Sequence, residues 1–554
     1  MTRIAIVGSG PMALYALSEL VRSASPLSIS IYEKSGSVGT GTPYSRQINH
    51  PQLLANIASI EIPPLLDTLT DWLESRTAGG LTALGIARSD IHDRTFFPRV
   101  LVGAYLRDQF VRLCEIASVN GHQIDVSAKT TVTNISGADG DVELTLMRDD
   151  QRSTASFDYT IVATGHVADE AGSPGDTYHD SPYPTSRLMT IGKCRVGILG
   201  TSLSAIDAAV TIAYQHGRFE GRGPAMRYVP ADPSGKLEIS LMSRSGLLPE
   251  TDFFVPMPYE PLDTFTPAAI HQEVAQGQKG LLDRVFDLFS IQLAGLDPAY
   301  AERVGLASAT VKTYPDIYFA DRVGVDPIQW ARLNLAATLA LNESGKTTAW
   351  KYAILRMHEV FELAVPYLSE RDRKLFAGGL QKIFVDNYAA VPPESIARLI
   401  ALDQAGVLRV VPLGSNYLLN GGTDGEPFAV SGSGTQLVLD VLIDATGESA
   451  RPISQLPFAT LRRQLTFNGL QMCSLTKVPV WRDNSDVSRV YLAALPYLLG
   501  RRPFAQGLVS CHEIGATISK AILQGLLCPV PALERVLEHL LQAVELKTVR
   551  RQHQ

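Results

Sequence analysis

The sequence predicts an α/β fold, because a strand, a glycine-rich turn and a helix follow one another at two separate places. The first copy opens with the apolar run 3–7 and the second with the apolar run 196–199. From about 266 to 384, apolar residues recur at three- and four-residue spacing, which is typical of helices. At roughly 150 residues per folding unit, the 554-residue chain has room for both copies and an additional helical part.

Composition and charge are those of an ordinary globular protein. Hydrophobic residues make up 45% of the chain, charged residues make up 19%, and the formal net charge is −7. This charge argues against a nucleic-acid partner, because phosphates require a basic surface. No uninterrupted apolar run approaches the ~18 residues of a membrane-spanning helix. We therefore expect a soluble protein that binds neither nucleic acid nor membrane.

The first glycine-rich turn is predicted to bind the pyrophosphate of a dinucleotide. It matches the pattern G-x-G-x-x-G/A and opens a helix directly after a strand. The glycines allow a tight turn and close approach of the phosphates, and the helix start offers free N–H groups. The residues concerned are Gly8, Gly10, Pro11 and Ala13. The following strand ends in Glu33, a carboxylate placed to accept hydrogen bonds from ribose hydroxyls.

The second glycine-rich turn predicts a second dinucleotide with a different phosphate pattern. Gly200 and Ala205 keep the spacing, Ser202 replaces the middle glycine, and Ser204 is a further candidate contact in the same turn. The next strand of this unit ends in Ser243 and Arg244, at the place where the first unit ends in an acid. A hydroxyl and a guanidinium suit a 2′-phosphate, so the pattern favours NADPH over NADH. The predicted fold is therefore α/β with two dinucleotide-binding, Rossmann-like domains and a helical insertion.

Two further strands end in Ala-Thr-Gly, one at 163–165 and one at 445–447. This ending resembles the crossover segments of flavoproteins that bind two dinucleotides. The resemblance implies that Thr164, Gly165 and Gly447 lie beside the cofactors.

A more specific resemblance rests on four segments, which are 39–45, 53–57, 97–99 and 243–249. Together they look like a family of FAD/NAD(P)-binding proteins that includes flavin-dependent aspartate N-monooxygenases. Those enzymes are similar to ornithine and lysine N-hydroxylases and oxidise an amino group through a flavin hydroperoxide. The resemblance implies that FAD lies along the first turn and along Glu33, Tyr44, Asn56 and Arg99. The segment 506–510, with Gly507 and Ser510, resembles the late element whose helix start faces the flavin ring.

The function that follows is an NADPH-consuming N-monooxygenase that uses O2 to oxidise an aspartate-like amino acid to a hydroxylamine, nitroso or nitro product. The cofactor carries the chemistry, so we expect no catalytic side chain. We also expect no metal site, because the eleven histidines show no H-x-x-x-H spacing. Candidate substrate contacts are two cations of the helical part and two residues at its end: Lys351, Arg356, Asn387 and Tyr388.

Two other hypotheses stay open. One is an NADPH-dependent reductase that passes electrons to a quinone or a protein, and the other is a flavoprotein without catalysis. The five cysteines bear on this choice, because none forms the C-x-x-C pair of disulfide reductases. An odd, scattered set of cysteines also predicts the reducing cytoplasm as the compartment.

We expect five consecutive segments in the chain. The tail is amphipathic, and it packs either on the body of the protein or on a second subunit of a homo-oligomer. The segments are 1–180 for the first part of the FAD-binding domain, 181–265 for the NADPH-binding domain, 266–383 for the helical insertion, 384–530 for the return to both nucleotide domains, and 531–554 for the C-terminal helix.

Overall fold

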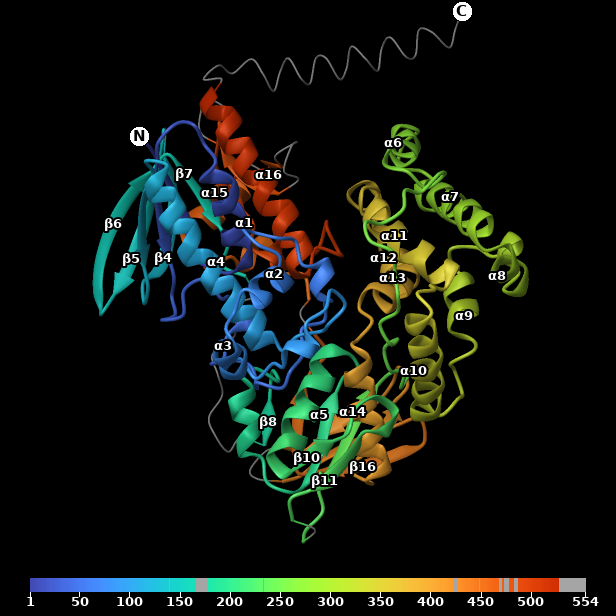
Figure 1. Cartoon of the computed structure of the whole chain (residues 1–554). Coiled ribbons are helices and arrows are strands. Elements are labelled where there is room, and N and C mark those ends of the chain that lie inside the picture. Colours follow the sequence, from blue (N-terminus) through green and yellow to red (C-terminus); the bar gives the residue numbers. More distant parts are fainter. Residues whose placement is uncertain are drawn as a thin grey trace, which may run out of the picture.

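The computed structural model consists of two sheet-based domains and one all-helical part (Figure 1). The helix expected at 531–554 lies outside the described residues. The structure describes residues 1–138, 140–165, 177–232, 234–422, 426–447, 449–467, 471–472, 478–482 and 487–527.

The first domain is built on a sheet of seven described strands in the order β18-β19-β20-β7-β1-β2-β3. Strand β1 pairs in parallel with both β2 and β7. Its buried residues come from continuous apolar runs, as expected for a strand covered on both faces. The strands are β1 (Thr2–Val7), β2 (Leu27–Tyr32), β3 (Gln123–Ser127), β7 (Tyr159–Val162), β18 (Gln471–Met472), β19 (Pro479–Arg482) and β20 (Ser488–Leu492).

Three helices share one apolar core with this sheet: α1 (Pro11–Leu20), α4 (Arg99–Val119) and α16 (Gly507–Leu527). Helices α1 and α16 are in direct contact, although they lie at opposite ends of the chain (Figure 1). A Cβ on Gly515 would lie only 2.9 Å from the carbonyl oxygen of Met12, so glycine permits this approach. The hydroxyl of Ser519 donates to the carbonyl oxygen of Ala16 at 2.9 Å. Helix α16, although far from α1 in sequence, therefore completes the first domain.

A second layer of the first domain consists of an antiparallel sheet and one helix. These elements are β4 (Thr131–Ala138), β5 (Asp141–Arg148), β6 (Gln151–Phe157) and α15 (Ala459–Phe467). Their apolar side chains form one core with Ala5 and Val7 of β1.

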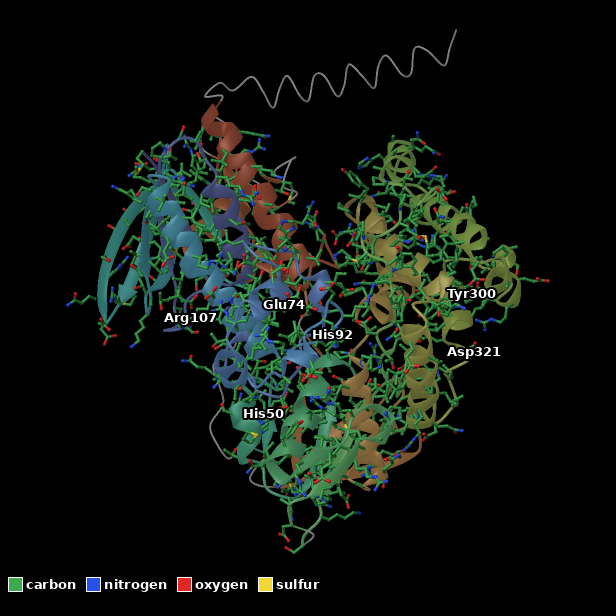
Figure 2. All side chains as sticks on the ribbon, viewed as in Figure 1. His50, Glu74, His92, Arg107, Tyr300 and Asp321 are labelled. Atoms are coloured by element: carbon green, nitrogen blue, oxygen red, sulfur yellow. The ribbon has the colours of Figure 1, made fainter. Side chains whose placement is uncertain are left out.

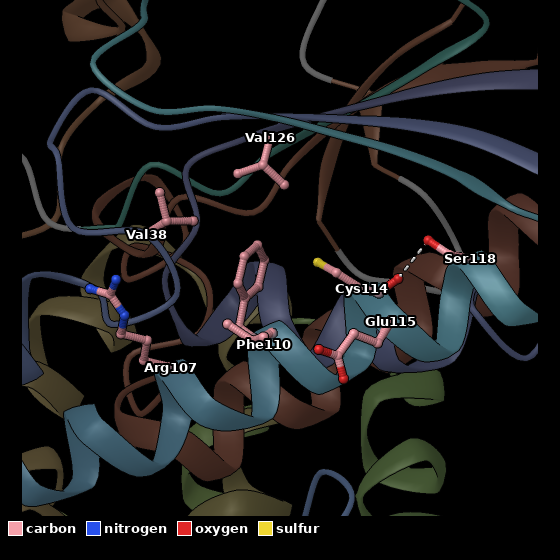
Figure 3. Close-up of a pocket in the computed structure, with 8 residues that line it drawn as sticks. Val38, Arg107, Phe110, Cys114, Glu115, Ser118 and Val126 are labelled. Atoms are coloured by element: carbon pink, nitrogen blue, oxygen red, sulfur yellow. Dashed lines mark hydrogen bonds between the residues drawn. The ribbon is translucent and has the colours of Figure 1, made fainter.

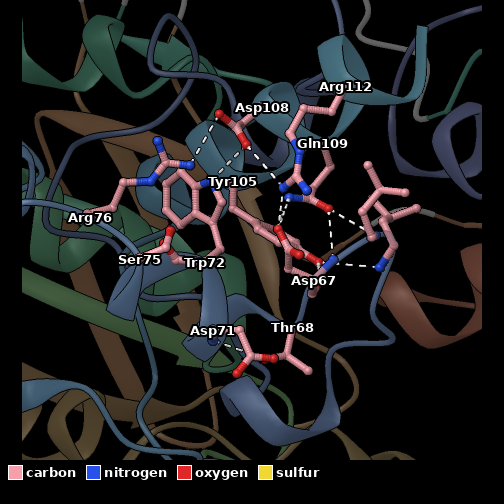
Figure 4. Close-up of polar contacts among 12 residues, drawn as sticks. Asp67, Thr68, Asp71, Trp72, Ser75, Arg76, Tyr105, Asp108, Gln109 and Arg112 are labelled. Atoms are coloured by element: carbon pink, nitrogen blue, oxygen red, sulfur yellow. Dashed lines mark hydrogen bonds and ion pairs between the residues drawn. The ribbon is translucent and has the colours of Figure 1, made fainter. Parts of the chain in front are cut away.

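A polar network ties the segment before and within α2 (Leu69–Glu74) to α4 (Figure 4). The Trp72 indole donates to Asp108 at 2.9 Å. The Gln109 amide oxygen accepts the backbone N–H of Asp67 at 3.2 Å, and the Asp67 carboxylate pairs with Arg112. This loop-rich stretch is thus held by hydrogen bonds in addition to the apolar packing of Leu69, Trp72 and Leu73. A short helix, α3 (Ala78–Ala83), follows it.

The second domain has a parallel sheet in the order β13-β12-β9-β17-β8. Helices α5 (Leu203–His216) and α14 (Pro393–Gln404) share its main apolar core. The strands are β8 (Tyr178–His179), β9 (Arg195–Leu199), β12 (Glu238–Ser243), β13 (Leu408–Pro412) and β17 (Val441–Asp444). Two antiparallel additions complete it: β10 (Gly217–Glu220) with β11 (Arg227–Pro230), and β14 (Leu418–Asn420) with β15 (Phe428–Gly432) and β16 (Thr435–Leu439).

The third part contains only helices and has its own aromatic core. Its elements are α6 (Pro267–Ala275), α7 (Leu281–Leu296), α8 (Pro298–Arg303), α9 (Tyr314–Phe319), α10 (Pro327–Glu343), α11 (Ala349–Glu362), α12 (Glu370–Gly378) and α13 (Leu380–Tyr388). We call residues 266–388 the middle domain. The prediction of an α/β fold with two Rossmann-like domains and a helical insertion is confirmed.

Candidate functional site

The turn between β1 and α1 brings three strands together at one point. Gly8 has φ of 101°, and its N–H donates to the carbonyl oxygen of Tyr32 at 2.8 Å. A Cβ on Gly8 would overlap the carbonyl oxygen of Ala163, just beyond β7. A side chain at this position is therefore excluded both by the backbone angle and by space. The residues Thr164 and Gly165 follow Ala163 directly, which places them at the same turn.

The start of α1 has the backbone features of a pyrophosphate-binding turn. Gly10 is the N-cap residue, and no side chain accepts from the first N–H groups of the helix. A Cβ on Gly10 would lie 3.3 Å from the Cα of Gly41, and a Cβ on Gly41 would lie 2.6 Å from Pro11. Two bare glycine backbones thus border a helix N-terminus, which is the arrangement that negatively charged phosphates require. The residues present fit the FAD that the sequence predicts.

Glu33 lies beside this turn, immediately after β2. One carboxylate oxygen accepts the N–H of Ser9 at 3.1 Å and its hydroxyl at 2.7 Å, and the other accepts the N–H of Ser35 at 2.8 Å. A carboxylate has about four acceptor positions, so one remains for a ribose hydroxyl. Its place agrees with the predicted role, which stays a prediction.

The second fingerprint repeats the first in detail. Gly200 has φ of 120°, and a Cβ there would lie 2.6 Å from the carbonyl oxygen of Ala445. The N–H of Ala445 donates to Leu199 at 2.8 Å, as that of Ala163 donates to Val7 at 2.8 Å. Each Ala-Thr-Gly strand therefore runs beside the first glycine of one fingerprint, and Gly447 has the same place in the second domain as Gly165 in the first.

The end of β12 lies against the second fingerprint. The Thr201 hydroxyl donates to the Ser243 hydroxyl at 3.2 Å and to the carbonyl oxygen of Leu247 at 2.6 Å. Arg244 is exposed, and its side chain forms no ion pair or hydrogen bond with the described residues. Ser202 caps α5 without a side-chain hydrogen bond, and Ser204 lies half-buried in its first turn. The hydroxyls and the cation thus lie near the N-terminus of α5. Thr201 is the second residue of the fingerprint, and the sequence pattern does not predict its role, because any residue is allowed at that position.

Arg99 lies where the two nucleotide domains meet. Its guanidinium pairs with Asp207 of α5 at 2.7 Å and donates to the Tyr183 hydroxyl at 3.2 Å and the carbonyl oxygen of Leu54 at 3.0 Å. Burial raises the pKa of the Asp207 carboxyl above its ordinary value, and the Arg99 cation opposes this shift. The structure therefore engages Arg99 in a contact between domains, whereas the sequence predicts an FAD contact.

Other residues of the first domain also reach across. The Asn56 amide donates to the carbonyl oxygen of Ala390 at 2.8 Å. His50 stacks on Tyr214 of α5 with 5.1 Å between ring centroids. Figure 2 shows His50 near the boundary between the blue ribbon of the first domain and the green ribbon of the second. Tyr44 stays within the first domain, where burial raises the pKa of its hydroxyl and Cys511 of α16 is a neighbour.

Most of the predicted substrate contacts are engaged by the protein itself. The Lys351 ammonium pairs with Glu250 at 2.6 Å. The Arg356 guanidinium donates to the carbonyl oxygen of Glu260 at 2.7 Å and lies 4.0 Å from the ring centre of Tyr352. Arg356 and Tyr352, which share one face of α11, are thus packed against each other. The substrate role of both cations stays a prediction, but their charges already have partners.

The two residues at the end of the middle domain differ from one another. The Asn387 amide donates to the Tyr318 hydroxyl at 2.9 Å inside the helices. Tyr388 instead stacks on His358 at 5.1 Å and lies 5.7 Å from Phe504. Phe504 shortly precedes Gly507, the first residue of α16, and Ser510 lies in the first turn of that helix. Of the four candidates, Tyr388 is the one that the structure brings near the predicted flavin helix.

Two small cavities lie against α4. One of about 370 Å³ is lined by Val38, Phe110, Cys114 and Val126 among others, and by none of the predicted site residues (Figure 3). The other, of about 280 Å³, includes Ser37, Thr40 and Tyr44 of the loop after Glu33. Within the described ranges, no three His, Cys, Asp or Glu side chains are grouped to hold a metal ion. None of the described helices is both long and apolar enough to cross a membrane.

The fold and the paired fingerprints define a flavoprotein with two dinucleotide-binding domains. Residues 5–167 match the model of the FAD-NAD(P)-binding family. Residues 266–388 match the YdhS-like middle domain. The chain belongs to the YdhS family: it is 39% identical over 526 residues to the uncharacterized protein YdhS of Escherichia coli K12, covering 95% of this chain and 98% of that one.

Solved structures with a similar fold include two ornithine hydroxylases. The reduced form of PvdA from Pseudomonas aeruginosa is 13% identical, with a TM-score of 0.49 over 94% of this chain and 100% of that chain. KtzI from Kutzneria sp. 744 is 15% identical, with a TM-score of 0.47 over 94% and 99%. The bacillithiol disulfide reductase Bdr of Bacillus cereus is 11% identical, with a TM-score of 0.41 over 94% and 99%. At these identities the likeness concerns the fold alone.

The chain thus has the fold of a flavin-dependent, NAD(P)-binding oxidoreductase. The prediction of an FAD/NAD(P)-binding flavoprotein is confirmed, and with it the cofactor pair of FAD and a nicotinamide dinucleotide.

Proposed function

We propose that this protein is an FAD-dependent monooxygenase that consumes NADPH and hydroxylates the nitrogen of a small amino acid. One observation carries the proposal. The same glycine turn occurs twice, with Gly8 against Ala163 and Gly200 against Ala445, and the strand that follows each turn ends in a residue of opposite charge. The first turn is followed by the carboxylate of Glu33, which suits ribose hydroxyls. The second is followed by the exposed cation of Arg244, which suits a 2′-phosphate.

Electrons on a reduced flavin in this protein are better accepted by O2 than by a disulfide. The sequence has no C-x-x-C pair. Burial raises the pKa of the Cys511 thiol to about 12 and that of the Cys114 thiol to about 11. Both thiols are therefore protonated at neutral pH, whereas thiol–disulfide exchange needs a thiolate.

FAD, when bound, supplies electron transfer from NADPH and the activation of O2. The chain's own part is to bind, orient and exclude water. The start of α1 would stabilise the phosphate charges, and the N-terminus of α16 would supply a positive dipole end at the flavin site that the resemblance implies. Tyr388, His358 and Phe504 form an aromatic wall near that helix start, which keeps water out.

The choice of amino acids to test as substrates follows from the protein partners of Lys351 and Arg356. Since Lys351 and Arg356 are held by Glu250 and by the carbonyl oxygen of Glu260, a dicarboxylate has fewer free partners than the sequence suggests. Aspartate remains the first compound, and ornithine and lysine are tested beside it. We further propose the cytoplasm as the compartment, on the scattered cysteines.

The experiment uses purified protein loaded with FAD and measures NADPH oxidation with each amino acid under ¹⁸O2. Substrate-stimulated NADPH oxidation and one ¹⁸O atom in the N-oxidised product support the proposal. Vigorous anaerobic turnover with a quinone, without labelled product, selects the reductase instead. If NADPH leaves the flavin absorbance unchanged, both enzymatic hypotheses fail.

A further inference from the structure

We propose that Phe504 and Arg502 are positioning residues, through which the middle domain sets the N-terminus of α16 against the flavin. This inference rests on the proposed function in one respect, which is that FAD lies at this helix start. The contacts themselves are independent of any cofactor.

Phe504 lies in the core of a domain to which it does not belong by sequence. It lies shortly before α16 of the first domain, yet its side chain is 6% exposed and part of the aromatic core of the middle domain. Its ring centroid lies 5.4 Å from that of His358, 5.5 Å from Phe384 and 5.7 Å from Tyr388. Phe504 therefore anchors the segment before α16 in the middle domain.

Glu362 of the middle domain also binds the backbone of this segment and the charge of Arg502. One carboxylate oxygen of Glu362, the last residue of α11, accepts the N–H of Phe504 at 3.2 Å. The other oxygen accepts from Arg502 at 2.8 Å, and both side chains are nearly buried, at 14% and 12% exposed. Burial raises the pKa of the Glu362 carboxyl, and the Arg502 cation opposes the shift. A buried carboxylate with both oxygens engaged tolerates little displacement of its partners.

The same arginine also reaches the helix that it positions. Its second guanidinium nitrogen donates to Glu513 in α16 at 3.0 Å. Arg502 thus joins α11 of the middle domain to α16 of the first domain. On its other side α16 packs along α1 around Gly515, so the helix is held from both domains.

The consequence concerns charge at the flavin. A helix N-terminus carries about half a positive charge, and its effect falls off within the first turn. A small shift of the α16 start therefore changes the stabilisation of negative charge on a reduced ring. Since the middle domain holds this start, its packing controls how readily NADPH reduces the cofactor.

The test compares Phe504→Ala with Phe286→Ala. Phe286 lies in the same aromatic core at 3% exposed, and its ring partners are Phe289 and Tyr314, so it is a matched control for lost packing. Amide hydrogen exchange at 505–510 is measured first, in protein stripped of FAD. We expect at least about tenfold faster exchange in Phe504→Ala and no change at these amides in the control.

The second readout is the flavin midpoint potential and the rate of flavin reduction by NADPH. Phe504→Ala and Arg502→Met are expected to lower the potential and to slow reduction about tenfold, as the loss of a helix-dipole contact predicts. Arg502→Lys, which keeps the charge, should restore part of the rate. The milder Phe504→Leu is used if Phe504→Ala does not fold.

Equal exchange, potential and reduction rate in the Phe504 and Phe286 variants would overturn the inference, because packing alone would then explain both. A failure of the proposed function looks different. If the wild-type protein reduces FAD but forms no N-oxidised product, the positioning role stands and the monooxygenase proposal falls. If the protein takes up no FAD, the exchange measurement still decides whether the middle domain holds the α16 start.

Discussion

Replacing Arg99 by methionine tests the contact that joins the two nucleotide domains. In the folded protein the Arg99 and Asp207 side chains are 14% and 10% exposed and 2.7 Å apart. Methionine keeps much of the arginine's apolar stem but removes its charge and its donors. Asp207 then remains buried without its ion-pair partner, and among the described residues the Tyr183 hydroxyl is the one side chain that still donates to it, at 2.5 Å.

The expected cost is ~3 kcal/mol in the free energy of unfolding, since removing one partner of a buried pair costs about 3–5 kcal/mol. The cost depends on pH in a defined direction. Burial already raises the pKa of Asp207 above 3.8, and the loss of Arg99 raises it further. The folded variant then binds more protons than the unfolded chain in this window, so its stability rises as pH falls through the raised pKa. The deficit should therefore shrink from about pH 8 to about pH 5.

Urea unfolding of both proteins at several pH values measures this, with Arg99→Met/Asp207→Leu as the partner variant. The double variant has no unpaired buried charge, so we expect it to be more stable than the single variant. A deficit that does not vary with pH, or a double variant as unstable as the sum of its single changes, would refute the reasoning. FAD content in the same samples shows whether Arg99 also serves the cofactor.

Three further changes test other parts of the site and the fold. Gly8→Ala should weaken FAD binding at least about tenfold, because its Cβ would overlap the carbonyl oxygen of Ala163; retained FAD on gel filtration would contradict this. Arg244→Ala should reduce the preference for NADPH over NADH about 10- to 100-fold, judged by the ratio of kcat/KM values, and an unchanged ratio would reject the 2′-phosphate contact. Asp67→Asn should cost under ~1 kcal/mol at neutral pH, since its ion pair is a third exposed. Arg112 holds the pKa of the Asp67 carboxyl below 3.8, so the cost should vanish as pH falls below that value in acid unfolding; a persisting cost would contradict it.

The parts of the site that could be predicted are local in sequence. A turn of six residues determines where Gly8 and Gly10 stand, and the strand that follows determines where Glu33 lies, so spacing alone locates them. The helical periodicity from about 266 to 384 likewise predicts the helical part, and the helices α6 to α13 span Pro267 to Tyr388. The position of Arg244 is predicted in the same way, because it lies at the end of the strand that follows the second turn.

The partners of Arg99, Asn56 and Phe504 could not be predicted in this way. Asn56 bonds to Ala390 across 334 positions of the chain, and Phe504 bonds to Glu362 across 142. No periodic pattern links residues so far apart, because their meeting depends on how three finished domains pack. From the sequence alone, an arginine such as Arg99 or a phenylalanine such as Phe504 could equally contact a ligand or lie on the protein surface.

The sequence by itself determined the two nucleotide turns, the charge that follows each of them and the class of cofactor, since these are properties of short backbone segments. Only the tertiary structure decided which cations already have protein partners. It engaged Arg99, Lys351 and Arg356 with protein partners, and it placed Tyr388 and Phe504 beside the start of α16. The physical reason is that burial and pairing are set by the contacts between domains, whereas a glycine turn is set by the residues within it.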